Sequence, residues 1–199
     1  RGGVAFDAGY AGNAVCAPSR AMLLTGRYST RFGFEFTPTP DGMSANVAAS
    51  YEAGPFLRKP IRHEVDPGAG LPYDSLGMPP EEITLAETLR DAGYHTVHIG
   101  KWHLGREARF RPEAQGFAET LTKEGVLFAR EDHPDVINAR LEFDPIDRFL
   151  WRQGGLEHRF NGGAPFDSTE YLTDWYTDEA VRVIENNRHR PFFLYLAHW

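Results

Sequence analysis

The chain has 199 residues, a formal net charge of −7 at pH 7 and 41% hydrophobic residues. A chain of this length is long enough for one domain with its own core, since such a domain typically buries about 70% of its unfolded surface. The acidic balance and the scattered lysines and arginines argue against nucleic acid or an anionic membrane as a partner. Because the chain is acidic overall, a bound anion must be held by a local group of residues. No apolar stretch is long enough to span a bilayer.

The first predicted helix begins around the only cysteine, Cys16. A single cysteine forms no intrachain disulfide, so its thiol is either an inert buried group or a functional one. Pro18 suits the first turn of a helix, and Gly26 suits the position just after its end. The thiol is therefore predicted at or just before a helix N-terminus, where free N–H groups favour sulfate or phosphate. Arg20, one turn further on, adds a fork of donors.

The next helix is predicted over residues 83–91. Thr84 and Glu87 have the spacing of a capping box, and Gly93 ends the helical pattern. Residues 94–99 follow as a strand, because they include three β-branched side chains.

A second pair of elements is predicted near the end of the sequence. The helix covers residues 177–187 with Thr177 as its N-cap, and residues 192–196 form a fully buried strand. A helix followed by an apolar strand, twice, indicates an α/β sheet with covering helices.

Long irregular regions are predicted over residues 28–80 and 106–168. Loops of this length are uncommon unless they are functional, so we expect them to shape the mouth of a pocket. The histidines outside the strand ends carry no pairing that indicates a metal site. Two are read as packing or surface residues (His95, His98), and four are read as lying in polar surroundings (His63, His133, His158, His189).

Two sequence strings resemble the type I sulfatase family. The string from Cys16 to Arg27, CAPSRAMLLTGR, is similar to the family signature C-x-P-S-R-x-x-x-L-T-G-R. The string over residues 93–105, GYHTVHIGKWHLG, resembles the second family marker, and residues 190–197 are similar to a strand that precedes a substrate-binding histidine. The resemblance implies an α/β fold of the alkaline-phosphatase and sulfatase kind, with a mixed sheet and helices on both faces. It also implies that residues 1–199 are the N-terminal portion of a catalytic domain, without the family's first strand and C-terminal half.

The resemblance implies specific roles for four residues. Cys16 would be oxidised to formylglycine (3-oxoalanine), whose hydrate attacks sulfur and then collapses to release sulfate. Arg20 would steady the formylglycine hydroxyls, Lys101 would clamp formylglycine and a sulfate oxygen, and His103 would be the hydrogen-bond partner and base. Independently of the family, a lysine and a histidine two residues apart in extended backbone point to the same side, as convergence on one anion requires.

The resemblance also implies one divalent cation, Ca²⁺ or Mg²⁺, bound in part by an oxygen of modified Cys16. The family's other metal ligands, an Asp-Asp pair and an Asp-Asn pair, are absent from this sequence. A hard cation takes about six oxygen ligands, so the remaining residues are not expected to form the site alone, and the isolated chain is expected to be inactive. His198 is out of register with the family's distal histidine and is not assigned.

The partners implied by the resemblance are a sulfated small molecule or glycan and a formylglycine-generating maturation enzyme. The implied location is periplasmic, extracellular or lysosomal. The leading hypothesis is hydrolysis of sulfate esters, including carbohydrate sulfates. Two alternatives stay open: a phosphonate or phosphate ester hydrolase of the same superfamily, and an inactive fragment that lacks the metal site.

Overall fold

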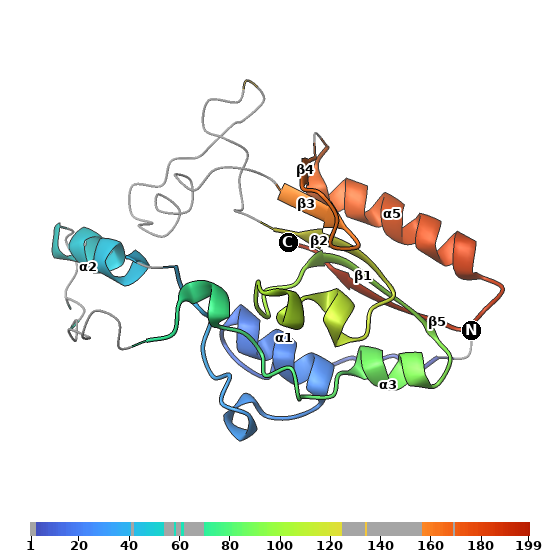
Figure 1. Ribbon diagram of the computed structural model, residues 1–199, viewed down its shortest axis with the longest axis horizontal. Coiled ribbons are helices and arrows are strands. Elements are labelled where there is room, and N and C mark those ends of the chain that lie inside the picture. Colours follow the sequence, from blue (N-terminus) through green and yellow to red (C-terminus); the bar gives the residue numbers. More distant parts are fainter. Residues whose placement is uncertain are drawn as a thin grey trace.

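A computed structural model describes residues 3–40, 42–53, 58, 61, 70–124, 134, 157–168 and 170–199. Its centre is a five-stranded sheet in the order β4-β3-β2-β1-β5 (Figure 1). β1 pairs in parallel with β2 and with β5, while β3 is antiparallel to β2 and β4 is antiparallel to β3. The predicted mixed sheet is therefore confirmed. The strands are β1 (His95–Lys101), β2 (Glu119–Lys123), β3 (Glu157–Phe160), β4 (Phe166–Asp167) and β5 (Phe192–Ala197).

Helices lie on both faces of this sheet (Figure 1). One face is covered by α1 and α3, and the other by α5, so the predicted arrangement of helices is also confirmed. The α-helices are α1 (Cys16–Thr25), α2 (Met43–Ala53), α3 (Leu85–Asp91) and α5 (Leu172–Asn187). Short 3-10 turns are η1 (Ser29–Arg31), η2 (Tyr73–Ser75), η3 (Ala108–Phe110) and η4 (Pro112–Gln115).

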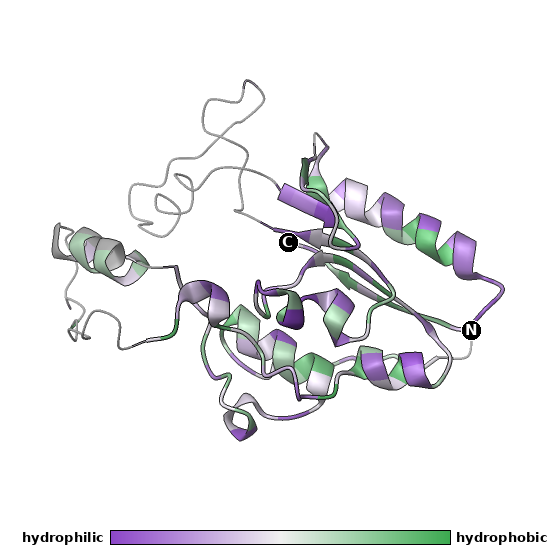
Figure 2. Cartoon of the chain, viewed as in Figure 1, coloured by the Kyte–Doolittle hydropathy of each residue, from purple (hydrophilic) through white to green (hydrophobic). Residues whose placement is uncertain are grey.

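Two separate hydrophobic cores lie beside β1, one on each face of the sheet. Val97 and Ile99 pack with residues of α5, whereas Trp102, just after the strand, packs with Ala17 and Ala21 of α1. In Figure 2, α5 carries both hydrophobic and hydrophilic residues, as expected for a helix that packs one side against a sheet. The sheet is thus buried from two sides, and its strand ends are left to form a site.

The ends of two helices follow the local sequence signals. Gly26 ends α1 in the left-handed conformation, with φ 64°, and its N–H donates to the carbonyl of Met22. Thr84 and Glu87 form the predicted capping box at the start of α3.

Three predictions about the elements were wrong. α5 begins at Leu172, and Thr177 lies inside it, where its hydroxyl donates to the Thr173 carbonyl at 2.7 Å. A threonine hydroxyl can bond back within a helix as well as cap one, so the cap signal was ambiguous. β5 is half-buried, not fully buried, because it forms one edge of the sheet in the described part of the chain.

The third error concerns the regions that were predicted to be irregular. They contain α2 and, between residues 106 and 168, the strands β2, β3 and β4. β2 has the sequence ETLTK, with a single aliphatic residue, so its strand character depends on pairing with β1 more than on its own pattern.

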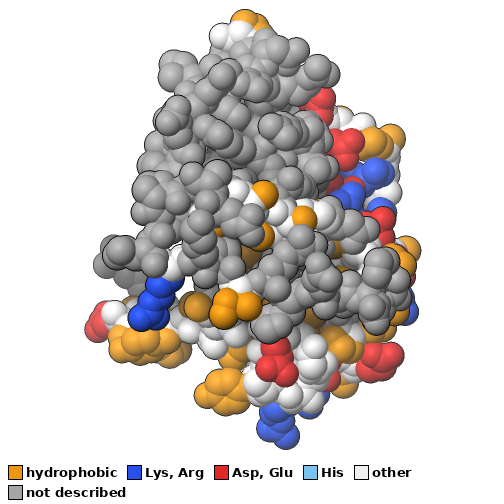
Figure 3. Space-filling model, turned by 90° about the vertical axis from the view of Figure 1, so that its left-hand side faces the viewer, with side chains coloured by type: hydrophobic (Ala, Val, Ile, Leu, Met, Phe, Trp, Pro, Cys, Tyr) orange, Lys and Arg blue, Asp and Glu red, His pale blue; other side chains and the backbone are white. Residues whose placement is uncertain are grey.

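Hydrophobic, acidic and basic side chains are interspersed over the described part of the face in Figure 3. In the part of the chain that the structure describes, no helix has the length and apolar character needed to cross a membrane.

Candidate functional site

The candidate site lies where the N-terminus of α1 meets the carboxyl end of β1. Cys16 is the first residue of α1, as predicted, and its thiol is exposed. Its Sγ lies 4.0 Å from the hydroxyl of Thr37, which also accepts from the Ala17 N–H at 3.4 Å. Thr37 therefore binds one of the free N–H groups at the start of the helix.

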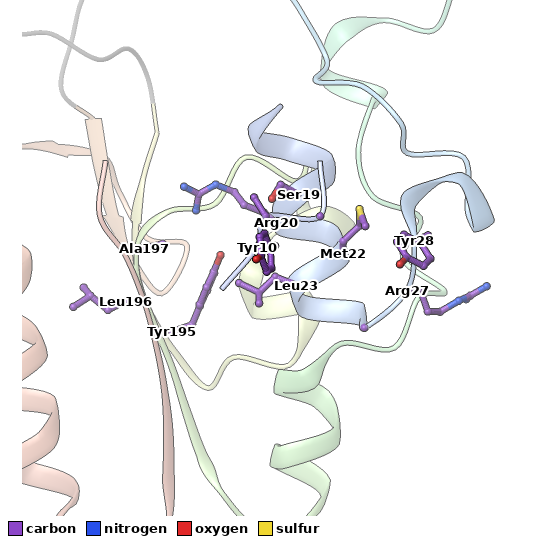
Figure 4. Close-up of a pocket in the computed structure, with 13 residues that line it drawn as sticks. Tyr10, Ser19, Arg20, Met22, Leu23, Arg27, Tyr28, Tyr195, Leu196 and Ala197 are labelled. Atoms are coloured by element: carbon purple, nitrogen blue, oxygen red, sulfur yellow. The ribbon is translucent and has the colours of Figure 1, made fainter. Parts of the chain in front are cut away.

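Arg20 joins α1 to the end of the sheet. Its Nη1 donates to the main-chain carbonyl of Lys101 at 3.0 Å, a contact between residues 81 positions apart in sequence. The Tyr195 ring points from β5 toward α1 and Arg20 (Figure 4). Burial raises the pKa of Tyr195, whereas the charge of Arg20 and a hydrogen bond with it act in the opposite direction. The Nε of Arg20 is buried and has no hydrogen-bond partner among the described residues.

Lys101 is the last residue of β1, and its side chain reaches Cys16. Burial lowers the pKa of Lys101; the charge of Cys16 and a hydrogen bond with its thiol raise it, and the charge of Arg20 lowers it. Lys101 thus connects the nucleophile position with the other cation of the site.

His103 lies two residues beyond the end of β1, but not in extended backbone as predicted. Its φ is 66°, so the chain turns through the left-handed region immediately after Trp102. Burial, followed by the charges of Lys101 and Arg20, lowers the pKa of His103 to about 4. The imidazole is therefore neutral near pH 7, and its Nδ1 is buried without a hydrogen-bond partner in the described ranges. Lys101 and His103 are therefore brought together by the turn after β1, and not by the alternation of side chains along an extended strand.

The structure brings together all four residues that the sequence indicated. Arg20 contacts the backbone of Lys101, Lys101 contacts Cys16, and the charges of Arg20 and Lys101 act on His103. Two cations and a neutral histidine next to a helix N-terminus can hold an oxyanion and exchange a proton with it.

The described residues do not form a divalent-cation site. Among them, no group of three or more His, Cys, Asp or Glu is placed to hold a metal ion. A hard cation needs several oxygen ligands, whereas the charged group that acts on Cys16 is the ammonium of Lys101.

A cavity of about 670 Å³ lies between α1 and β5 (Figure 4). Ser19 and Arg20 line it from α1, and Tyr195 and Ala197 line it from β5. Of the four candidate residues, Arg20 lines this cavity, whereas Cys16, Lys101 and His103 do not.

Sequence reasoning missed several neighbours of the site. Thr37 and Tyr195 reach it from distant parts of the chain. No local pattern marks Thr37, and Tyr195 was noted only as part of the string over residues 190–197. Lys123 ends β2 next to Lys101, a placement that depends on the register of β1 and β2.

Two histidines differ in how well they were predicted. His98 is fully buried among aromatic rings, in agreement with a packing role, and burial lowers its pKa to about 3. His158 was predicted in polar surroundings, which is wrong: it is fully buried, and its Nε2 lies 2.7 Å from the Tyr176 hydroxyl. His63 and His133 lie outside the described residues.

The fold and the site together define an α/β protein in which cationic side chains form an anion-binding site at the carboxyl end of a strand. The Sulfatase family model matches residues 1–198, and the chain belongs to this family. An arylsulfatase of Hemicentrotus pulcherrimus is 30% identical over 202 residues, which are 98% of this chain and 30% of that protein. The N-acetylgalactosamine-6-sulfatase of Sus scrofa is 32% identical over 200 residues, covering 98% of this chain and 32% of that protein. The chain therefore spans about a third of the length of these relatives.

Solved structures show the same fold. Ps i-CgsB matches with a TM-score of 0.60 and 23% identity, over 96% of this chain and 35% of that one. BT4656, solved in complex with its substrate D-glucosamine-2-N,6-O-disulfate, matches with a TM-score of 0.51 and 23% identity, over 96% and 26% of the two chains. These likenesses confirm the predicted alkaline-phosphatase-like α/β fold.

Proposed function

We propose that the complete protein hydrolyses sulfate esters, with Cys16 as the nucleophile position after conversion to formylglycine. The observation that carries this proposal is the convergence of Cys16 and Arg20 from α1 with Lys101 and His103 from the end of β1. Membership of the Sulfatase family supports the same reaction. The activity belongs to the complete protein, since this chain spans only about a third of its relatives.

The proposed roles follow from the charges of the side chains. Lys101 holds an anionic oxygen next to residue 16 as a point charge, and Arg20 holds the hydroxyls of the modified residue with its planar fork of donors. Hydrated formylglycine supplies the hydroxyl that attacks sulfur. Arg20 is aligned for this role by its hydrogen bond to the Lys101 carbonyl, which ties its guanidinium to the end of β1.

His103 acts as the proton-transfer group in this proposal. Its pKa is about 4 in part because the charges of Lys101 and Arg20 oppose protonation. A bound sulfate ester offsets these charges, so it raises the pKa of His103 toward the range useful for proton transfer near neutral pH. The histidine would therefore become an effective base only when the anion is in place.

The metal ion and the remaining substrate contacts belong to residues beyond those described. We assign Ca²⁺ or Mg²⁺ to a site that modified Cys16 would share with oxygen ligands from elsewhere in the complete protein. A formylglycine-generating enzyme is the maturation partner, and a periplasmic, extracellular or lysosomal location is part of the same proposal.

A carbohydrate sulfate is the proposed substrate class. One relative is an N-acetylgalactosamine-6-sulfatase, and a protein of the same fold was solved with a disulfated glucosamine as its substrate. The site of this chain supports this choice with a local pair of cations, Arg20 and Lys101, whose charge suits a sulfate.

The test combines peptide mass spectrometry at residue 16 with turnover of an aryl sulfate and an aryl phosphonate monoester by the complete protein. We expect formylglycine in active material, preference for the sulfate, and no turnover by Cys16→Ala. Full activity with only unmodified Cys16 would refute the nucleophile assignment. A strong preference for the phosphonate would replace the sulfatase by a phosphonate ester hydrolase.

A further inference from the structure

Lys123 lies beside Lys101 at the same edge of the sheet. The two residues are register partners in the parallel pair β1 and β2, and each is the last residue of its strand. Register partners in neighbouring strands point to the same face, and such strands lie about 4.8 Å apart. In open α/β sheets, ligands bind beyond the carboxyl ends of strands, which is where both lysines lie.

Both ammonium groups contact the same aromatic ring. The Nζ of Lys123 lies 4.2 Å from the centre of the Trp199 ring, and the Nζ of Lys101 lies 4.3 Å from it. The Trp199 side chain is 38% exposed, whereas Lys123 is 4% exposed. A buried lysine is unusual, because loss of hydration disfavours its charge.

The charge of Lys123 is nevertheless retained near neutral pH. Burial, followed by the charge of Lys101, lowers the pKa of Lys123 to about 8, and the carboxylate of Glu157 acts in the opposite direction. Two like charges close together in a partly buried place repel each other, and a bound anion relieves this repulsion.

We propose that Lys123 binds a second anionic group of the substrate, next to the sulfate ester that Lys101 holds. This inference rests on the proposed function. A sulfate ester carries one negative charge, and Arg20 and Lys101 already face it. A third cation at the same edge of the sheet matches a substrate with a further sulfate or a carboxylate near the reacting group. Lys123 is thus a specificity-determining residue, and the substrate class is a polyanionic sugar.

The experiment compares three substrates of the complete, formylglycine-containing enzyme. They are N-acetylgalactosamine 6-sulfate, its 4,6-disulfate, and a disaccharide that carries one 6-sulfate and a hexuronic acid carboxylate. In Lys123→Met, we expect kcat/KM for one or both dianionic substrates to fall by about tenfold to one hundredfold, the value of a hydrogen bond to a charged group. The loss should appear mainly in KM, while turnover of the monosulfate stays within about twofold of wild type. The substrate that loses most tells a second sulfate from a carboxylate.

Arg90→Met is the matched control, because it also removes one positive charge but from an exposed ion pair with Asp91 on α3. It should leave the ratio of the kcat/KM values unchanged. Lys123→Arg keeps the charge and should retain much of the preference for the dianionic substrates. Melting temperatures identify a variant that does not fold, in which case Lys123→Gln replaces Lys123→Met.

Equal losses on all three substrates would overturn the proposal in favour of a structural role for Lys123. Unchanged ratios in Lys123→Met would overturn it as well. If the wild-type enzyme hydrolyses none of the sulfates, the proposed function itself fails, an outcome distinct from a loss of discrimination in the variant.

Discussion

The two faces of the sheet differ in whether their buried polar atoms have hydrogen-bond partners among the described residues. On the α5 face, His158 and the Tyr176 hydroxyl are buried together and are 2.7 Å apart. On the α1 face and in the loops beside it, the Arg20 Nε, the His98 Nδ1 and the His103 Nδ1 are buried without partners among the described residues. The His158–Tyr176 pair is thus satisfied internally, whereas Arg20 and His103 each keep a polar atom that a ligand can use.

This difference has an energetic meaning. A buried polar atom without a partner costs about 1–3 kcal/mol. Two of the unpartnered atoms belong to side chains that carry proposed roles, Arg20 and His103. The α1 face therefore gives up stability for a binding site, whereas the α5 face supplies stability, and substitutions on the two faces should separate these effects.

The largest expected effect is on the α1 face, in Lys101→Ala and His103→Ala. Each variant removes one group that faces the oxyanion, and one lost donor of this kind costs on the order of 10²–10³ in rate. Steady-state kinetics with an aryl sulfate, together with a thermal melt, give both quantities for the complete enzyme. The melting temperature should change little, since Lys101 is the last residue of β1 and His103 lies two residues beyond it.

Arg90→Ala is the control, because this exposed arginine lies on α3 away from Cys16. Wild-type kinetics in Lys101→Ala or His103→Ala would remove that residue from the site. A large fall in melting temperature would instead assign it a structural role and weaken the contrast between the two faces.

The next effect compares two arginines of one segment, Arg20 and Arg27. Arg20→Lys keeps the charge but loses the planar fork that reaches the Lys101 carbonyl, so turnover should fall by about tenfold to one hundredfold. Arg27 forms an exposed ion pair with Glu82, and Arg27→Lys should change stability by less than about 0.5 kcal/mol and leave turnover unchanged.

The extent of conversion of Cys16 must be measured in both variants, because the proposed maturation enzyme would act on the same segment as Arg20. Full conversion with normal turnover in Arg20→Lys would contradict the bidentate role. Low turnover with low conversion would place the defect in maturation.

The third effect is a pH dependence that arises from His98. Its folded-state pKa, about 3, lies below its ordinary value of 6.5, so the unfolded state binds the proton more readily. The stability linked to this group is therefore present above pH 6.5 and is lost as the pH falls toward 3. One histidine of this kind costs about 2 kcal/mol between pH 7 and pH 5.

Urea unfolding at the two pH values tests this expectation. In His98→Gln, the loss of stability from pH 7 to pH 5 should be smaller than in the wild type by about 2 kcal/mol. His189→Gln removes an exposed histidine of the α5 end and should leave the loss as it is. An unchanged loss in His98→Gln would assign the acid sensitivity to other groups, His103 among them.

The sequence predicts the parts of the molecule that depend on local signals. Gly26 ends α1 and the Thr84 capping box starts α3, since both devices act within a few residues. Cys16, Arg20, Lys101 and His103 were found because they stand in two continuous strings.

The remaining features depend on contacts between distant segments. β2 is a strand because it pairs with β1, and Lys123 reaches Lys101 only through that register. The left-handed turn at His103 and the approach of Thr37 to Cys16 are likewise set by tertiary packing. No periodicity or cap signal in the sequence reports such contacts.

The smallest effect belongs to the α5 face, in Tyr176→Phe. This change removes the hydroxyl that His158 contacts and keeps the ring, which packs in the core with Val97 and Ile99. Loss of one buried hydrogen bond should lower the free energy of unfolding by about 1 kcal/mol. Turnover by the complete enzyme should stay at the wild-type value, because the hydroxyl bonds with His158 on the face opposite α1.

Tyr171→Phe is the matched control: Tyr171 is 74% exposed, and its hydroxyl can be lost without cost to the core. A fall in turnover that exceeds the fall in stability would show that the α5 face also acts on the site, and the division between the two faces would then be wrong.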